Sequence, residues 1–333
     1  MNVVYSASDL YAPLTGISLT SLLMNHTDVD QLHVAVLDNG ISDGNKEKLR
    51  LTARSFGRDL RFVPLPSWIR EKRVDVGKWN ISTFGRLFEA SSLPELDRVI
   101  HMDCDTVVDG SLKPLWDLDM SRAAIAGAPD CLSDAYKLNI GLKSTDVYLN
   151  AGLIVMNLAR IRALRLEQKF RNYIEKNGRL LAYADQEVLN ACIPAEEKIQ
   201  LPLRYNSYTI LHYLSYQQLK TLRHAEHMFS EEDYEDAVCR PVALHFTGCF
   251  LEGTRPWTEG DRHPRKAVFE KYKRQSQWAE MAAWRDRRPV RDKAASIGAK
   301  IVPKIILAPA AGYVHGVYVP RRNKTRRENM RWE

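Results

Sequence analysis

Short apolar runs alternate with longer segments of helical pattern over the first hundred residues of the chain. The pattern predicts strands at 2–7, 33–37, 60–64 and 97–102, and helices at 13–25, 42–55 and 83–90. Strand and helix in alternation indicate an α/β fold with a mostly parallel sheet covered on both faces. Ligands of such sheets bind beyond the carboxyl ends of the strands.

The second half of the chain has a more mixed pattern. It predicts strands at 149–157 and 241–246, and helices at 166–178, 185–191 and 268–284. After Arg285 the composition changes, because basic segments flank an apolar stretch at 297–307 that Pro303 interrupts. We therefore expect one α/β domain over residues 1–284, followed by a basic extension over 285–333.

Composition is typical of a soluble globular protein, with 45% hydrophobic and 27% charged residues in 333 positions. No run approaches the roughly 20 apolar residues of a membrane-spanning helix. The first residues, MNVVYSASDL, lack a basic segment followed by an apolar one, so no secretory signal is expected. The five cysteines are scattered and form no C-x-x-C pair, which argues against a disulfide framework and favours a reducing compartment.

Two carboxylates follow the predicted strand at 97–102, where the sequence reads HMDCDTVVD. Asp103 and Asp105 flank Cys104. Side chains at i and i+2 of an extended segment point to the same side, so both carboxylates can reach one hard divalent cation. The polar stretch 6–9, which follows the first strand, falls at the same edge of the predicted sheet. A solvated turn with two unrelated aspartates is the alternative.

Two further polar positions fit a metal-dependent site. His245 ends a short apolar strand, and imidazole is a common third ligand for manganese. A structural histidine is the alternative at this position. Asp185 and Gln186 open a predicted helix, where N-capping and compensation of the helix dipole are the alternative roles.

Six short sequence segments of the chain are considered together because of their order and spacing. They are VVYSASDLYA at 3–12, STFGRLF at 82–88, HMDCDTVVDGSLKPLWD at 101–117, LNAGLIVMNL at 149–158, ADQEVLN at 184–190, and LHFTG at 244–248 followed by RPW at 255–257. In this order and spacing, over about residues 1–260, they resemble glycosyltransferase family 8, which includes bacterial lipo-oligosaccharide galactosyltransferases and lipopolysaccharide glucosyltransferases. The resemblance implies a single Rossmann-like, nucleotide-sugar-binding domain of the GT-A type with a mixed, mostly parallel central sheet.

The resemblance also implies a reaction, the transfer of glucose or galactose from a UDP donor with retention at the anomeric carbon. By matching position, Asp103, Asp105 and His245 would ligate Mn²⁺, or alternatively Mg²⁺, which lowers the cost of negative charge on the departing UDP. Gln186 would lie under the anomeric carbon. We favour front-face attack, in which the acceptor hydroxyl enters on the side that UDP leaves, and Asp185 is the alternative nucleophile.

The remaining matches concern donor and acceptor binding. The resemblance places the donor against Ala7, Ser8, Asp9, Tyr11, Arg86, Asp103, Cys104, Asn150, Ala151, Gly248 and Arg255, and the acceptor against Asp130. Ser8 replaces an aspartate of many relatives and Arg255 replaces a lysine, but serine still accepts a hydrogen bond and arginine binds phosphate well. Without the resemblance, Tyr11 would be a half-buried surface aromatic and Arg86 an exposed helix arginine.

Basic charge is concentrated at the end of the chain. Residues 285–333 contain 13 Lys and Arg against 4 Asp and Glu, a net charge of +9, so the rest of the chain carries −2. Basic residues around an apolar stretch indicate attachment to an anionic membrane surface, with 321–327 over the headgroups. A disordered, solubilising tail is the alternative. The slightly acidic body has no obvious base-stacking platform, which argues against nucleic-acid binding.

These features favour a retaining, metal-dependent hexosyltransferase that acts on a glycan or lipid-linked saccharide in bacterial surface-polysaccharide synthesis. We expect it in the cytoplasm, peripheral at the inner face of the cell membrane. A non-catalytic nucleotide-sugar-binding protein is the alternative, although the metal triad and the Asp-Gln pair are both present. A metal-dependent phosphohydrolase is a third hypothesis, in which the Asn-Ala-Gly and Asp-Gln blocks would have no role.

Overall fold

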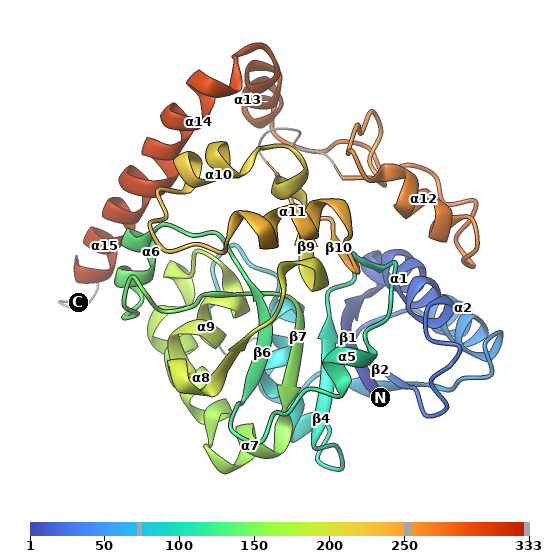
Figure 1. Cartoon of the computed structure of the whole chain (residues 1–333). Coiled ribbons are helices and arrows are strands. Elements are labelled where there is room, and N and C mark those ends of the chain that lie inside the picture. Colours follow the sequence, from blue (N-terminus) through green and yellow to red (C-terminus); the bar gives the residue numbers. More distant parts are fainter. Residues whose placement is uncertain (72–74, 250–254, 330–333) are drawn as a thin grey trace.

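The structure, a computed structural model, describes residues 1–71, 75–249 and 255–329 (Figure 1). The strands in these residues are β1 (Asn2–Ser8), β2 (His33–Asn39), β3 (Leu60–Pro64), β4 (Arg98–Met102), β5 (Thr106–Val108), β6 (Ile125–Pro129), β7 (Leu149–Asn157), β8 (Lys198–Gln200), β9 (Ser207–Tyr208) and β10 (Ala243–His245). All six predicted strands are present, and the sequence pattern missed β5, β6, β8 and β9.

In the described part of the chain, seven strands form a central sheet with the order β3-β2-β1-β4-β7-β6-β8. Neighbouring strands from β3 to β4 are parallel, β7 runs antiparallel to both β4 and β6, and β8 pairs with β6 in parallel. The expected α/β fold with a mixed, mostly parallel central sheet is therefore confirmed.

Helices surround this sheet (Figure 1). The α-helices are α1 (Ala12–Met24), α2 (Asp43–Arg54), α3 (Ser67–Arg70), α4 (Glu89–Ser92), α5 (Lys113–Trp116), α6 (Asp134–Asn139), α7 (Leu158–Ala163), α8 (Leu166–Asn177), α9 (Ala184–Cys192), α10 (Tyr216–Arg223), α11 (Glu231–Cys239), α12 (Lys266–Lys273), α13 (Val290–Ile301), α14 (Lys304–Gly312) and α15 (Val319–Asn329). None of these described helices is both long and apolar enough to span a membrane.

Two predicted helices differ from the observed ones. The segment predicted at 83–90 is mostly a 3₁₀ helix, Ile81–Phe88, which is followed by α4. It lies against β1, because the Ser6 hydroxyl donates to the carbonyl of Ser82 at 2.8 Å. The helix predicted at 268–284 ends at residue 273, because the Ser276 hydroxyl donates to the carbonyl there at 2.8 Å and competes with a further helical turn.

Alternate residues of the central strands pack on opposite faces of the sheet. In β1, Val3 and Tyr5 belong to a hydrophobic cluster with α1, whereas Val4 belongs to a cluster with Phe84 and Phe88. Val3, Val4 and Tyr5 are all fully buried. Burial on both faces explains why the strands have continuous apolar runs in the sequence.

A second, three-stranded sheet with the order β5-β10-β9 lies next to the carboxyl end of β4 in the described residues. The antiparallel pairing of β10 with β5 places His245 opposite Thr106. Asp103 and Asp105 occupy the turn between β4 and β5. This pairing therefore brings His245 next to both aspartates, although it lies far from them in the sequence.

The basic tail is mostly helical from residue 290 to residue 329 and runs along α10 and α6 (red in Figure 1). It consists of α13, α14, a π-helical segment (Tyr313–Tyr318) and α15. Ala308 of α14 is buried in a hydrophobic cluster that includes residues of α10. Arg327 of α15 pairs with the buried carboxylate of Glu187 on α9. The described part of the tail is therefore packed on the α/β domain.

A close contact between α1 and the segment after α12 gives a test of the packing. A Cβ added at Gly16 would lie 1.9 Å from a carbon of the Trp278 ring. We expect Gly16→Ala to lower the free energy of unfolding by about 1–3 kcal/mol, measured by chemical denaturation, because overpacking a core forces its neighbours to move.

The matched control is Gly44→Ala in α2, where nothing lies within 4 Å of the added methyl group. Alanine also favours a helix over glycine, so this control should keep or raise the free energy of unfolding. Equal stabilities of the two variants would contradict the packing of Trp278 on α1.

Candidate active site

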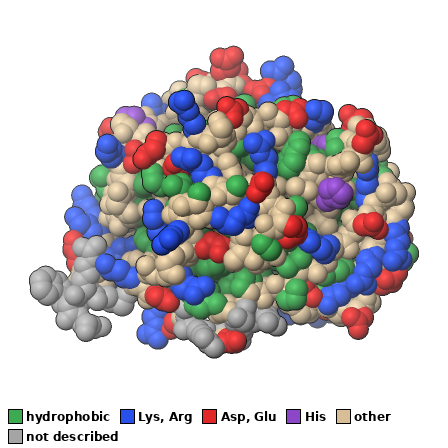
Figure 2. Space-filling model, turned by 90° about the horizontal axis from the view of Figure 1, so that it is seen from below, with side chains coloured by type: hydrophobic (Ala, Val, Ile, Leu, Met, Phe, Trp, Pro, Cys, Tyr) green, Lys and Arg blue, Asp and Glu red, His purple; other side chains and the backbone are tan. Residues whose placement is uncertain are grey.

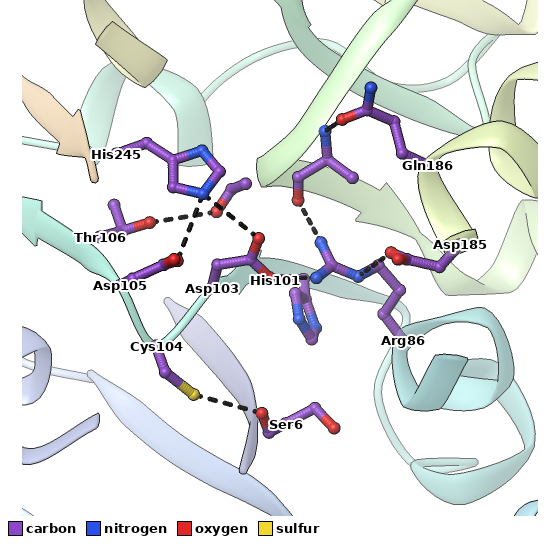
Figure 3. Close-up of polar contacts among 12 residues, drawn as sticks. Ser6, Arg86, His101, Asp103, Cys104, Asp105, Thr106, Asp185, Gln186 and His245 are labelled. Carbon is purple, nitrogen blue, oxygen red and sulfur yellow. Dashed lines mark hydrogen bonds and ion pairs between the residues drawn. The ribbon is translucent and has the colours of Figure 1, made fainter. Parts of the chain in front are cut away.

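Three potential metal ligands meet at the carboxyl end of β4 (Figure 3). Nε2 of His245 lies 3.3 Å from a carboxylate oxygen of Asp105 and 3.5 Å from one of Asp103. Ligand atoms of all three residues lie within 4.8 Å of one another. Two carboxylates and an imidazole are a donor set that suits Mn²⁺ or Mg²⁺. The fold thus brings the three predicted ligands together.

The other ring nitrogen of His245 sets the orientation of the imidazole. Nδ1 lies 3.1 Å from the side-chain oxygen of Asn206, so a proton on Nδ1 would be donated there and Nε2 would face the carboxylates as an acceptor. The backbone of β7 passes close to the ring, because a Cβ at Gly152 would lie 2.0 Å from Nδ1. Only glycine permits this approach, which leaves the ring little room to rotate.

Neighbouring charges shift the pKa values of His245 and Asp105. Burial disfavours the imidazolium of His245, but the carboxylates of Asp105 and Asp103 outweigh burial and raise the His245 pKa above its ordinary value. Burial also disfavours the Asp105 carboxylate, but His245 and Arg255 outweigh it and hold the Asp105 pKa below its ordinary value. Arg255 contributes through an ion pair with Asp105 at 3.0 Å. The cluster is therefore a site that attracts positive charge.

Arg86 is a buried cation between two carboxylates. Its guanidinium pairs with Asp103, its Nε lies 2.6 Å from an oxygen of Asp185, and it donates to the carbonyl of Ala151 (Figure 3). The side chain is 4% exposed, so the alternative of an exposed helix arginine is wrong. Burial disfavours the charged guanidinium, but Asp103 and Asp185 outweigh it and raise the Arg86 pKa, so Arg86 stays protonated.

Asp185 lies in the first turn of α9 and faces Arg86. Its side chain is 5% exposed, and burial raises its pKa to about 6 despite the neighbouring guanidinium. The N-cap of α9 is Tyr183, which makes no side-chain cap, so the capping role considered for Asp185 is wrong. The carboxylate instead holds Arg86 from the side opposite to Asp103.

A chain of side-chain hydrogen bonds joins Gln186 to the three candidate metal ligands, which we call the metal cluster. Asn206 donates to Asn150 at 2.8 Å, and Asn150 donates to Asp130 at 3.0 Å. Gln186 donates to the same oxygen of Asp130 at 2.9 Å. The side-chain oxygen of Gln186 accepts from the backbone N–H of Ala151 at 3.0 Å. Both ends of the Gln186 amide are thus fixed.

A cavity of about 580 Å³ lies over the metal cluster, and we call it the donor cavity. The predicted site residues in its lining are Ser8, Tyr11, Arg86, Asp103, Cys104, Asp105, Asp130, Asn150, Gln186, His245, Gly248 and Arg255. Those outside the lining are Ala7, Asp9, Ala151 and Asp185. The Asp9 carboxylate accepts from the Ser42 N–H and the Asn45 amide, both at 2.8 Å, so it serves the start of α2 instead of the cavity.

Other lining residues were missed in the sequence. They are mainly polar or aromatic residues of loops, helix ends and the short strand β9, such as Trp79, Tyr183, Tyr208 and Arg223. No periodicity marks them, although an aromatic residue in the polar loop around Trp79 was a weak signal. Tyr11 is half-buried, which also fits the alternative of a half-buried surface aromatic. Its ring packs edge-on against Trp284 with centroids 6.0 Å apart.

Comparisons with known proteins agree with this geometry. The model of the family "Glycosyl transferase family 8" matches residues 2–260. General stress protein A of Bacillus subtilis is 26% identical over 286 residues, which are 84% of this chain and 94% of that protein. Lipopolysaccharide 1,2-glucosyltransferase of Escherichia coli K12 is 24% identical over 294 residues, which are 84% of this chain and 79% of that protein.

The fold also matches a solved structure of the galactosyltransferase LgtC in complex with donor and acceptor sugar analogues. The TM-score is 0.70 at 22% identity, and the match covers 89% of this chain and 100% of LgtC. This likeness supports the GT-A type of fold. Since the family model covers well over half of the sequence, the chain belongs to glycosyltransferase family 8 and is a glycosyltransferase.

Proposed function

We propose that this glycosyltransferase moves glucose or galactose from a UDP-sugar, with retention, to a glycan or lipid-linked saccharide of a bacterial surface polysaccharide. One observation carries the proposal: the predicted metal ligands, Gln186 and Asp130 all line a single cavity. The lipopolysaccharide glucosyltransferase among the relatives supports a hexose donor and a surface-glycan acceptor.

The donor's diphosphate would lie over the metal cluster. Asp103, Asp105 and His245 would hold Mn²⁺ or Mg²⁺, and a divalent cation bound there would neutralise charge on the departing UDP. Arg255 lines the same part of the cavity and would contact the phosphates. Ser8 and Tyr11, at the carboxyl end of β1, would hold the nucleoside.

Two observations favour front-face attack over a covalent intermediate. Gln186 is neutral, and both ends of its amide are already hydrogen bonded, so it is a poor nucleophile. Asp185 is outside the lining of the donor cavity and is paired with Arg86. In the proposed reaction the acceptor hydroxyl enters on the side that UDP leaves, and the leaving phosphate takes its proton. Asp185 then acts by holding Arg86 in place.

Loss of a metal ligand tests the enzyme function against the non-catalytic binding protein. We expect Asp105→Asn to lower Mn²⁺-dependent hydrolysis of UDP-glucose and UDP-galactose about 100-fold or more, because a neutral amide is a poor substitute for a carboxylate on a hard cation. Asp117→Asn, which changes an exposed ion pair with Lys113, is the matched control. Full Mn²⁺-dependent turnover by Asp105→Asn, or no hydrolysis of any UDP-sugar by the native protein, would refute the proposal.

The role of Asp185 can be tested with an external nucleophile. We expect Asp185→Ala to turn over more slowly by about 10–100-fold, because Arg86 loses a buried partner, and sodium azide should not restore the rate. The measurement is the initial rate of UDP release, together with analysis of the sugar product. If azide restored the rate and gave a glycosyl azide of inverted configuration, Asp185 would be the nucleophile and front-face attack would be wrong.

The tail offers a surface for an anionic membrane. Ile297 and Ile301, one turn apart on α13, are 60% and 76% exposed, and Ile305 of α14 is 78% exposed. Lys300 and Lys304 lie between them in sequence and are also exposed. By contrast, acidic and basic side chains are interspersed on the face that Figure 2 shows. We infer that α13 and the start of α14 bind the bilayer peripherally, with the isoleucines in the interface and the lysines at the headgroups.

Removal of two exposed isoleucines tests the membrane surface. We expect Ile301→Asn/Ile305→Asn to bind phosphatidylglycerol vesicles about ten-fold more weakly in a sedimentation assay, because each isoleucine loses apolar burial worth about 1 kcal/mol or more. Leu51→Asn on α2 is the control, since Leu51 is 43% exposed and lies outside the tail. Equal vesicle binding by the native protein and both variants would contradict the inference.

A further inference from the structure

A second cavity of about 380 Å³ adjoins the donor cavity. Trp79, Tyr183 and Arg223 line both cavities, so the two meet at these side chains. The opposite wall is formed by the tail, through residues of the π-helical segment and of α15, such as Arg322 and Arg326. We call this space the tail cavity.

The charged groups of the tail cavity are all positive. The Lys and Arg residues in its lining are Lys78, Arg179, Arg223, Arg322 and Arg326. No Asp or Glu belongs to this lining among the described residues. Arg179 has a carboxylate partner, Asp75, at 2.5 Å. The other three arginines have no carboxylate within ion-pair distance in the part of the chain that the structure describes.

Arg223 is the deepest of these cations. It ends α10, and its buried Nε has no hydrogen-bond acceptor among the described atoms. Asp130 is near enough to favour the charged form of Arg223, but the two make no ion pair among the described residues; one oxygen of Asp130 accepts from both Asn150 and Gln186. The side chain of Arg223 is half-buried. A guanidinium that has lost part of its water and has no anion is costly, so its position at the meeting of the two cavities favours an anionic ligand.

Aromatic rings complete the lining. Tyr136 and Tyr183 pack edge to face with centroids 5.0 Å apart, and the Lys78 ammonium lies 4.7 Å from the centre of the Trp79 ring. Aromatic faces pack against the C–H surfaces of a sugar ring. Guanidinium groups bind phosphate oxygens in a bidentate manner. Together these groups suit a sugar that carries a phosphate.

We propose that the tail cavity binds the phosphate-bearing end of a saccharide acceptor, whose reacting hydroxyl reaches the donor cavity past Trp79 and Arg223. This assignment rests on the proposed hexosyl transfer and names the chemical class of its acceptor, a saccharide phosphate or diphosphate, free or linked to a lipid. It also makes the tail part of the substrate site. Arg322 and Arg326 lie one turn apart on α15, so both can contact one phosphate group.

The test is calorimetric binding to the full-length protein with its donor cavity filled by UDP and Mn²⁺. The probes are glucose 1-phosphate, galactose 1-phosphate, the two methyl hexosides, inorganic phosphate and a short-chain polyprenyl diphosphate glucose. Arg322→Ala/Arg326→Ala removes two exposed arginines of the tail cavity. Arg321→Ala removes an exposed arginine of the same helix that is outside the lining.

We expect a hexose 1-phosphate to bind the native protein and Arg321→Ala equally, and Arg322→Ala/Arg326→Ala at least about ten-fold more weakly, with an affinity that falls as salt rises. The methyl hexosides should bind all three proteins weakly and alike. Tighter binding of the polyprenyl diphosphate glucose than of the hexose phosphates would assign a lipid-linked acceptor, and the reverse order would assign a free one. Either order of affinity supports the proposal, provided that Arg322→Ala/Arg326→Ala binds these ligands more weakly than the native protein does.

Equal binding of the hexose phosphates by the native protein and the double variant would overturn the proposal. Inorganic phosphate that binds as tightly as the hexose phosphates would also overturn it, since the site would then bind an ion only. Hydrolysis of UDP-sugars, measured on the same proteins, separates the two proposals. Its absence in the native protein would refute hexosyl transfer, whereas hydrolysis by a double variant that binds hexose phosphates normally would refute only the tail cavity.

Discussion

The geometry of the active site depends on the buried guanidinium of Arg86. Asp103 approaches it from the end of β4 and Asp185 from the start of α9, and the carbonyl of Ala151 on β7 accepts its third contact. Without this cation, the two carboxylates and the carbonyl would repel one another in a place with little water. Removing one partner of such a buried pair typically costs about 3–5 kcal/mol, because the remaining charge has no partner. Arg86 therefore holds together the end of β4, the start of α9 and β7, and it fixes the carboxylates of Asp103 and Asp185.

Polar contacts form a closed ring around the donor cavity that begins and ends at Arg86. The backbone of Ala151 links Arg86 to Gln186, and Gln186 shares Asp130 with an asparagine pair that ends at the imidazole of His245. His245 faces Asp103, which closes the ring at Arg86. A change at one member alters the partner available to the next. The side chains around the cavity are thus held in place by one another before any ligand binds.

The sequence contained enough information for six of the strands and for the grouping of Asp103, Asp105 and His245. Buried parallel strands have continuous apolar runs. Two aspartates at a strand end also fit a solvated turn, and the family resemblance is what favoured a cation site. The strands β5, β8 and β9 have two or three residues, too few for any periodicity. Family resemblance located Arg86, but its burial depends on a 3₁₀ helix that the apolar spacing did not distinguish from an α-helix. Asn206 had no signal, because its role arises only when β9 and β10 pair.

The ion pair between Arg327 and Glu187 connects the tail to the core of the α/β domain. Glu187 follows Gln186 on α9, and its fully buried carboxylate accepts from the hydroxyls of Tyr136 and Tyr173 as well as from the tail arginine. Detachment of the tail would leave this carboxylate in the core without a cation. The change in composition near residue 285 is therefore a boundary of charge, across which the tail contacts the core of the α/β domain. A ligand that moved α15 would therefore also change the surroundings of the helix that carries Gln186.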